Sequence, residues 1–218
     1  MLIIAPDFAR QIELPGVGPC PRPVDIDRSV TGFTDLVSLR VYTFARDMII
    51  HGEAEEDELF IVPLSGTIDV DVTGGSTSSF ALHSGGRTAA AYLPPHDHYR
   101  LHVRSDANVA YARARPRNGK AKTARAFDRL DGALAVVGYA DSLDIAQATM
   151  AGDCRGAPSQ LVDYDGERLI HVRSNDGYAI KLAGQQLYDW QTLALGRGDP
   201  GTIDAVSDRA SILVVAAT

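Results

Sequence analysis

Apolar and polar residues alternate with a period of two along most of this chain. The clearest example is the stretch 67–72, in which Ile68, Val70 and Val72 alternate with threonine and aspartate. Because successive residues of a strand face opposite sides, this stretch is expected to be a strand with one apolar, buried face and one acidic, exposed face. A second stretch, 59–64, is apolar throughout and contains Pro63.

Pairs of turn-forming residues separate the apolar runs. Examples are Ser65-Gly66, Gly74-Gly75, Gly85-Gly86 and Pro94-Pro95. Turn signals about every 8–12 residues between short strands are typical of a sandwich or a barrel. Further strands are expected over residues 89–93, 99–103, 109–114, 133–137, 143–148, 169–172, 178–182, 193–195 and 212–215.

The strand pattern is interrupted once, over residues 116–132, and then resumes in the same style. We interpret the interruption as a boundary between two modules. The sequence therefore predicts an all-β chain of two tandem cupin-like, jelly-roll β-barrel modules, the arrangement called a bicupin. The expected parts are an extended N-terminal arm (1–30), a first module (31–116), a linker (117–132) and a second module (133–218) with a degenerate metal motif.

Charge and hydropathy exclude two classes of partner. The formal net charge of the 218 residues is -7, whereas a protein that follows nucleic-acid phosphates needs a basic stripe. The basic residues between Arg113 and Arg125 are interpreted as part of a solvated linker. No window approaches the roughly 20 apolar residues that span a bilayer. We therefore expect no nucleic acid and no membrane partner, and the N-terminus lacks a signal-peptide pattern, which predicts a cytoplasmic protein.

His51, Glu53 and Glu58 have the spacing of a cupin metal site, with glutamate in place of the second histidine. The spacing suits metal binding because alternate strand residues face the barrel interior together. His98 would supply the fourth ligand from a later strand. Two histidines and two carboxylates could hold Mn, Fe or Zn. The alternative is that residues 51–58 form an acidic, exposed loop.

His96, His98 and His102 form the densest histidine cluster of the chain. The prolines before them disfavour a helix, and on a strand these histidines share one face with Arg100. That face is either a wall that binds a ligand or a metal, or the solvent side of a sheet.

A series of short motifs in the first half resembles a known family. Residues 58–70 form a strand–turn–strand motif, followed by matches at 86–87, 91–95, 108–110 and 114–116. Together they resemble the 5-deoxyglucuronate isomerase family of myo-inositol catabolism, which is related to the uronate ketol-isomerases of the pectin pathway. The resemblance implies aldose–ketose isomerisation of a sugar acid, with a divalent ion as Lewis acid and a general base to move the proton.

That family keeps its metal ligands in the second module, where this chain departs from the pattern. Residues 149–152 match the family's turn, but Gln160 and Val162 stand where two histidines belong, and Asp163 fits the following aspartate. A divalent ion held by one carboxylate and an amide would be held weakly.

Two residues remain as catalytic candidates in the second module. The resemblance implies that Glu167 is the family's retained glutamate. His171, four residues later, is either a substitute ligand or an ordinary strand histidine with a local partner.

Two functional hypotheses follow. The first is a sugar-acid isomerase that uses Glu167 and His171, with Mn, Fe, Ni or Zn held there or by the first-half set; a metal-dependent oxygenase at the first-half set is a weaker variant. The second is a non-catalytic bicupin without a metal, which binds a small molecule or acts as a scaffold. The expected partners are a small-molecule sugar acid and, because bicupins resembling this family self-associate, a second copy in a homodimer. The first-half metal candidates are His51, Glu53, Glu58 and His98.

Overall fold

The structure of the protein is a computed structural model that describes residues 1–75, 77–118, 122–150, 164–174, 180–205 and 210–217. Its regular structure in these ranges is β apart from one short helix, α1 (Arg28–Thr31). The prediction of an all-β chain is therefore confirmed. None of the described helices is long and apolar enough to cross a lipid bilayer.

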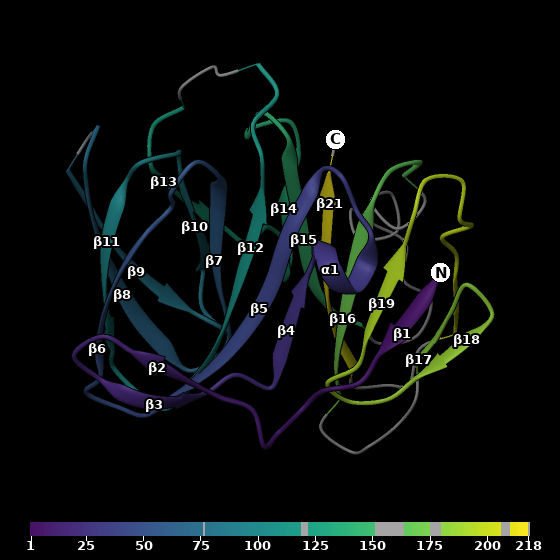
Figure 1. Ribbon diagram of the computed structural model, residues 1–218, viewed down its shortest axis with the longest axis horizontal. Coiled ribbons are helices and arrows are strands. Elements are labelled where there is room, and N and C mark those ends of the chain that lie inside the picture. Colours follow the sequence, from purple (N-terminus) through teal and green to yellow (C-terminus); the bar gives the residue numbers. More distant parts are fainter. Residues whose placement is uncertain (76, 119–121, 151–163, 175–179, 206–209, 218) are drawn as a thin grey trace.

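The first barrel consists of two sheets that face each other (Figure 1). The larger sheet has the strand order β13-β10-β7-β12-β5-β4, and the smaller sheet has the order β6-β11-β8-β9. The hairpin of β2 (Gln11–Leu14) and β3 (Gly18–Pro21) packs against this barrel. The larger sheet comprises β4 (Val24–Asp27), β5 (Leu36–Phe44), β7 (Glu58–Ser65), β10 (Thr88–Leu93), β12 (Ala107–Ala114) and β13 (Arg125–Asp128); the smaller one comprises β6 (Ile49–Glu53), β8 (Thr67–Thr73), β9 (Ser78–His83) and β11 (His98–Val103).

The second barrel has the same plan. Its larger sheet has the order β1-β19-β16-β21-β15-β14, and its smaller sheet has the order β18-β17-β20. These strands are β1 (Leu2–Ile4), β14 (Ala133–Val136), β15 (Leu143–Met150), β16 (Arg168–Ser174), β17 (Ile180–Leu182), β18 (Gln185–Leu187), β19 (Thr192–Leu195), β20 (Ile203–Ala205) and β21 (Ala210–Ala217).

The two larger sheets match strand for strand. The central strands β10, β7, β12 and β5 of the first sheet correspond to β19, β16, β21 and β15 of the second. At one edge, each sheet also contains a strand from a segment that lies outside its own module in the sequence. The strand β13, from the stretch expected as a linker, pairs with β10. The strand β1, from the expected N-terminal arm, crosses to the second barrel and pairs with β19. The two modules are thus related by a pseudo-twofold arrangement.

Three apolar cores lie between the four layers that Figure 1 shows side by side. One fills the first barrel, one fills the second barrel, and the third lies between the two larger sheets. The third core contains Phe60, Val62 and Tyr92 from the first module and Leu169 and Val215 from the second. The two barrels therefore share one continuous core.

This layering explains the two hydrophobic patterns of the sequence. In β8, Ile68, Val70 and Val72 are buried and the residues between them are partly exposed, as expected for an outer sheet with one wet face. The strand β7 lies in an inner sheet that is covered on both faces, so its residues 59–64 are all apolar. Pro63 sits beside a shift in the register between β7 and β12, where a missing ladder N–H is tolerated.

The shared core predicts that the two barrels unfold together. Replacing Leu169 by alanine should lower the free energy of unfolding by about 2 to 5 kcal/mol, because it leaves a cavity in a fully buried layer. Urea unfolding followed by circular dichroism should show one transition, shifted as a whole. The matched control, Leu130→Ala, removes a side chain that is 79% exposed and should change stability by less than about 0.5 kcal/mol. Two separate transitions, only one of them shifted, would contradict the shared core.

Candidate functional site: the carboxylates between the two modules

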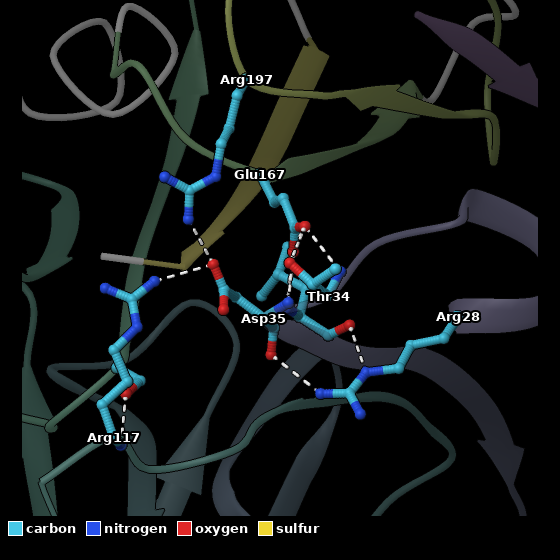
Figure 2. Close-up of polar contacts among 8 residues, drawn as sticks. Arg28, Thr34, Asp35, Arg117, Glu167 and Arg197 are labelled. Atoms are coloured by element: carbon cyan, nitrogen blue, oxygen red, sulfur yellow. Dashed lines mark hydrogen bonds and ion pairs between the residues drawn. The ribbon is translucent and has the colours of Figure 1, made fainter.

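The carboxylate of Glu167 lies between the modules and accepts four hydrogen bonds from the loop before β5 (Figure 2). Its Oε1 accepts from the backbone N–H of Thr34 at 2.6 Å and from the Thr34 hydroxyl at 3.0 Å. Its Oε2 accepts from the backbone N–H groups of Asp35 and Leu36, both at 2.8 Å. Glu167 is 6% exposed, so the fold itself uses both of its oxygens.

Glu58 makes the corresponding contacts from the first module. Its Oε1 accepts from the backbone N–H of Asp141 at 2.7 Å and from the Tyr92 hydroxyl at 2.8 Å, and its Oε2 accepts from the backbone N–H of Ser142 at 2.8 Å. Burial and the bond to Glu58 raise the pKa of Tyr92 well above its usual range, which keeps this hydroxyl a donor.

The two sets of contacts are equivalent under the pseudo-twofold arrangement. Glu58 begins β7 and Glu167 immediately precedes β16, which are matching strands. The loops that they bind precede the matching strands β5 and β15. Each module therefore binds a loop of the other through one buried glutamate, and we call this pair of contacts the reciprocal clamp.

An ion network around Asp35 closes one side of the clamp (Figure 2). Arg117 and Arg197 both donate to Asp35 Oδ2, at 2.7 and 2.5 Å. Burial alone would raise the pKa of the Asp35 carboxyl, but the hydrogen bonds from Arg197 and Arg117 outweigh it and lower that pKa. The backbone N–H of Arg117 also donates to the Ser142 hydroxyl at 3.0 Å, so one residue joins both clamped loops.

His171 lies in β16 and is completely buried. Its Nδ1 is 3.0 Å from the Thr192 hydroxyl, and its ring lies edge-on to Trp190. Burial, with a smaller effect of the Arg173 charge, lowers the pKa of His171 to about 3. The imidazole is therefore neutral at physiological pH.

The structure does not bring Glu167 and His171 together. They are four residues apart on an extended chain, which separates them by roughly 13 Å at 3.3 Å per residue. Glu167 binds the loop before β5, whereas His171 contacts Thr192 in β19. The two side chains do not approach a common ligand position.

The first-half candidates are divided between two sheets. His51 and Glu53 are exposed on β6, and His98 is exposed on the neighbouring β11, with its Nδ1 3.7 Å from Glu53 Oε2. Glu58 lies in the other sheet of the barrel and binds the second module instead. The structure thus brings Glu53 and His98 together, leaves His51 along the same exposed face and separates Glu58 from all three.

The face that carries His98 is the solvent side of the smaller sheet. His98 and Arg100 are exposed on β11, His102 is partly exposed, and His96 lies in the turn before this strand. The expectation of a solvated basic linker is wrong for Arg113, which is 9% exposed and donates to the backbone oxygens of Glu53 and Ala54. Arg113 therefore binds the backbone at the point where β6 ends.

The described residues do not fit the divalent ion that the family resemblance implies. Both oxygens of Glu167 already accept backbone hydrogen bonds, and His171 faces a different part of the fold. Among the described residues, no three His, Cys, Asp or Glu side chains form a group that could hold a metal ion. Gln160, Val162 and Asp163 lie outside the described residues.

Two pockets lie beside the reciprocal clamp, one at each glutamate. The Glu58 pocket has a volume of about 610 Å³ and lies between the loop before β7, the β8–β9 turn, residues 94–97 and the linker. The Glu167 pocket has a volume of about 410 Å³. Its charged groups pair with neighbours: the Met1 ammonium lies 2.9 Å from Asp199, and Arg197 donates to Asp35.

The sequence contains a pattern that indicates the clamp, although the spacing of candidate metal ligands did not reveal it. A glutamate stands directly before each matching apolar run, in Glu58-Leu59-Phe60-Ile61 and in Glu167-Arg168-Leu169-Ile170. An alignment of the two halves on these runs would have paired the two glutamates and suggested a common structural role.

The clamp predicts a stability role for Glu167. The Glu167→Gln variant replaces one acceptor oxygen by an NH₂ group that faces backbone N–H donors. The free energy of unfolding should fall by about 2 to 3 kcal/mol, because charged hydrogen bonds are lost and buried donors are left unpaired. Chemical denaturation measures this change. The matched control, Glu56→Gln, alters a side chain that is 75% exposed and should leave stability unchanged; equal effects of the two variants would contradict the clamp.

The buried imidazole predicts a pH effect on stability. In the unfolded chain His171 titrates near its ordinary pKa of about 6.5, whereas in the fold its pKa is about 3. Between these values the unfolded state binds more protons, so the stability contributed by neutral His171 is lost as the pH falls. Urea unfolding at several pH values from 7 to 4 should show a steeper loss for the wild type than for His171→Gln, by up to about 1.4 kcal/mol per pH unit. Parallel curves would show that His171 is accessible to protons in the fold.

Comparison with known proteins agrees with this architecture. An IolB-like protein from Salmonella typhimurium LT2 superposes with a TM-score of 0.69 and 15% identity, over 100% of this chain and 93% of its own. The bacterial pirin YhhW from Escherichia coli, in complex with nickel(II), has a TM-score of 0.64 and 13% identity, over 99% of each chain. A cupin 2 conserved barrel domain protein from Leptotrichia buccalis has a TM-score of 0.53 and 11% identity, over 99% of this chain and 92% of its own. At these identities the likeness shows the fold, and the predicted bicupin is confirmed.

The search of curated proteins found no match. The model of the KduI/IolB family matches residues 22–135, which is more than half of the chain. The 5-deoxyglucuronate isomerase IolB belongs to that family, so the resemblance seen in the first-half motifs is confirmed. The matched range ends where the second barrel begins, at β14. On this match, the chain is a divergent member of the KduI/IolB family.

Proposed function

We propose that this chain is a small-molecule-binding or scaffolding bicupin in which the carboxylates of Glu58 and Glu167 join the two barrels instead of holding a metal. The single observation that carries the proposal is the set of four hydrogen bonds accepted by Glu167. A carboxylate oxygen that coordinates a divalent ion directs its lone pairs at the ion. Glu167 directs them at the backbone of residues 34–36.

The interior of the second barrel supports the same proposal. Its apolar core, which includes Ile170, Val172, Leu193 and Val214, is buried. A metal-dependent isomerase needs several nitrogen or oxygen ligands that converge inside the barrel. The side chains of this core offer apolar contacts instead.

A second candidate function is aldose–ketose isomerisation of a sugar acid, favoured by membership of the KduI/IolB family. A bound Mn, Fe, Ni or Zn ion would act as Lewis acid on the substrate oxygens. The stretch that resembles the family's metal motif, residues 158–163, lies outside the described residues. Glu167 would act on this reaction only by positioning the loop before β5.

Metal analysis and an activity assay separate the two functions. Protein purified without chelator should contain far less than one transition-metal ion per chain, and uronates should not isomerise after Mn, Fe, Ni or Zn is added back. Near-stoichiometric metal together with turnover would overturn the proposal. The Glu167→Gln variant adds a second readout, because metal content that drops in this variant while its circular dichroism stays native would identify Glu167 as a ligand.

A further inference from the structure

The Glu58 pocket differs from the Glu167 pocket in having polar groups that the fold does not use. Asp97 lines it and is 3% exposed. Its Oδ1 accepts from the backbone N–H of Gly75 at 2.9 Å, whereas its Oδ2 is buried and has no hydrogen-bond partner among the described residues. Buried carboxylate oxygens are normally paired, so Oδ2 is an acceptor that lacks its donor.

The turn between β8 and β9 fixes the Asp97 carboxylate in place. A Cβ atom on Gly74 would lie 2.4 Å from Asp97 Oδ1, and Gly74 has a φ of 146°. Only glycine fits there, because the turn backbone lies directly against the carboxylate. The position of Asp97 at the pocket is therefore set by the backbone of a neighbouring hairpin.

The charges around the pocket are mainly negative. Among the described residues, Glu56, Glu58 and Asp97 line it together with one cation, Lys122. The Lys122 ammonium lies 5.9 Å from the centre of the Tyr139 ring, a cation–π contact, and takes part in no ion pair among those of the described residues. A ligand that carried its own carboxylate would be placed beside two buried carboxylates, which is unfavourable at short range.

The remaining walls of the pocket are apolar and rigid. Pro94, Pro95 and Pro116 contribute ring surfaces to it. Ring surfaces of this kind suit the C–H face of a small cyclic or branched polyol, whose hydroxyls then point to the polar rim. Apolar walls with a few placed polar groups are the usual form of a small-ligand site.

We propose that the Glu58 pocket binds a small, neutral, polyhydroxylated ligand such as a sugar or sugar alcohol, with one ligand hydroxyl donating to the Asp97 carboxylate, which lines the pocket. The Lys122 ammonium donates to a hydroxyl or ring oxygen of the same ligand. This inference rests on the proposed binding function and names its site and ligand class. It differs from the sugar acid that the family resemblance implies, because the pocket is acidic.

A glycine pair tests the site without disturbing the fold. A Cβ atom on Gly75 would lie 3.6 Å from Asp97 Oδ1, which is an ordinary van der Waals contact. It would otherwise enter open space at the pocket. A Cβ on Gly85, in a different turn, would lie 3.5 Å from His83 and outside the pocket. Binding to the full-length protein is measured by saturation-transfer NMR and calorimetry with a panel of neutral hexoses, pentoses and sugar alcohols, each hexose paired with its uronic acid. Gly75→Ala should weaken the best neutral ligand at least tenfold, and Gly85→Ala should not change it.

A second variant tests the hydrogen bond itself. Asp97→Asn keeps the size of the side chain, and its amide oxygen can still accept from Gly75, but an NH₂ group replaces the acceptor Oδ2. Affinity for the neutral ligand should fall at least tenfold. Asp71→Asn, on the exposed face of the smaller sheet, is the matched control and should bind like the wild type. Circular dichroism and thermal unfolding establish that each variant is folded.

The outcomes separate this inference from the proposed function. The inference is overturned if no neutral compound binds, if uronic acids bind at least as tightly as their neutral partners, or if Gly75→Ala binds like Gly85→Ala. If a small molecule binds and Gly75→Ala leaves its affinity unchanged, the proposed binding function stands but the Glu58 pocket is excluded as the binding site. Metal-dependent isomerisation of a uronate would overturn the proposed function. The neutral-ligand site would then be judged by the binding measurements alone.

Discussion

Two buried glutamates that accept backbone hydrogen bonds across a module interface are the interaction on which the rest of this structure depends. A carboxylate removed from water must find several donors, because an unpaired buried charge is strongly destabilising. Glu58 and Glu167 find theirs in loops of the opposite barrel. Separating the barrels would leave both charges and at least five backbone N–H groups without these partners. The shared apolar core and the clamp therefore favour the same relative position of the two barrels.

The clamp also changes the interpretation of Glu167, which the family resemblance implies is a metal ligand. The same residue type at the start of a barrel strand can ligate a metal or accept backbone N–H groups, and its lone pairs serve one use at a time. In this chain the second use is observed for Glu167, and its counterpart Glu58 shows it as well. Because two matching positions have the same role, that role follows from the symmetric architecture of the two barrels. Space for a ligand then remains outside the clamp, at the pockets that adjoin it.

The sequence predicted local structure well and long-range partners poorly. Period two identified β8, and the uninterrupted apolar run identified β7, because burial of a strand face depends on side chains within a few residues. The role of Glu167 depended on Thr34, which is 133 residues away in the chain, and no local pattern encodes such a partner. Spacing correctly placed His51 and Glu53 on one face of a strand but could not say that this face is exposed. For His171, the alternative of a strand histidine with a local partner agrees with its contact to Thr192.

The strand exchange at the N-terminus has a consequence for the order of synthesis. The strand β1 pairs with β19, which follows it by about 190 residues. At about 5 to 20 residues per second, a ribosome needs on the order of 10 to 40 s to make that partner. During this interval β1 has no sheet to join, and an unpaired apolar strand can pair with another chain. Completion of the second barrel is therefore also the step that pairs one edge of β1 within its own chain.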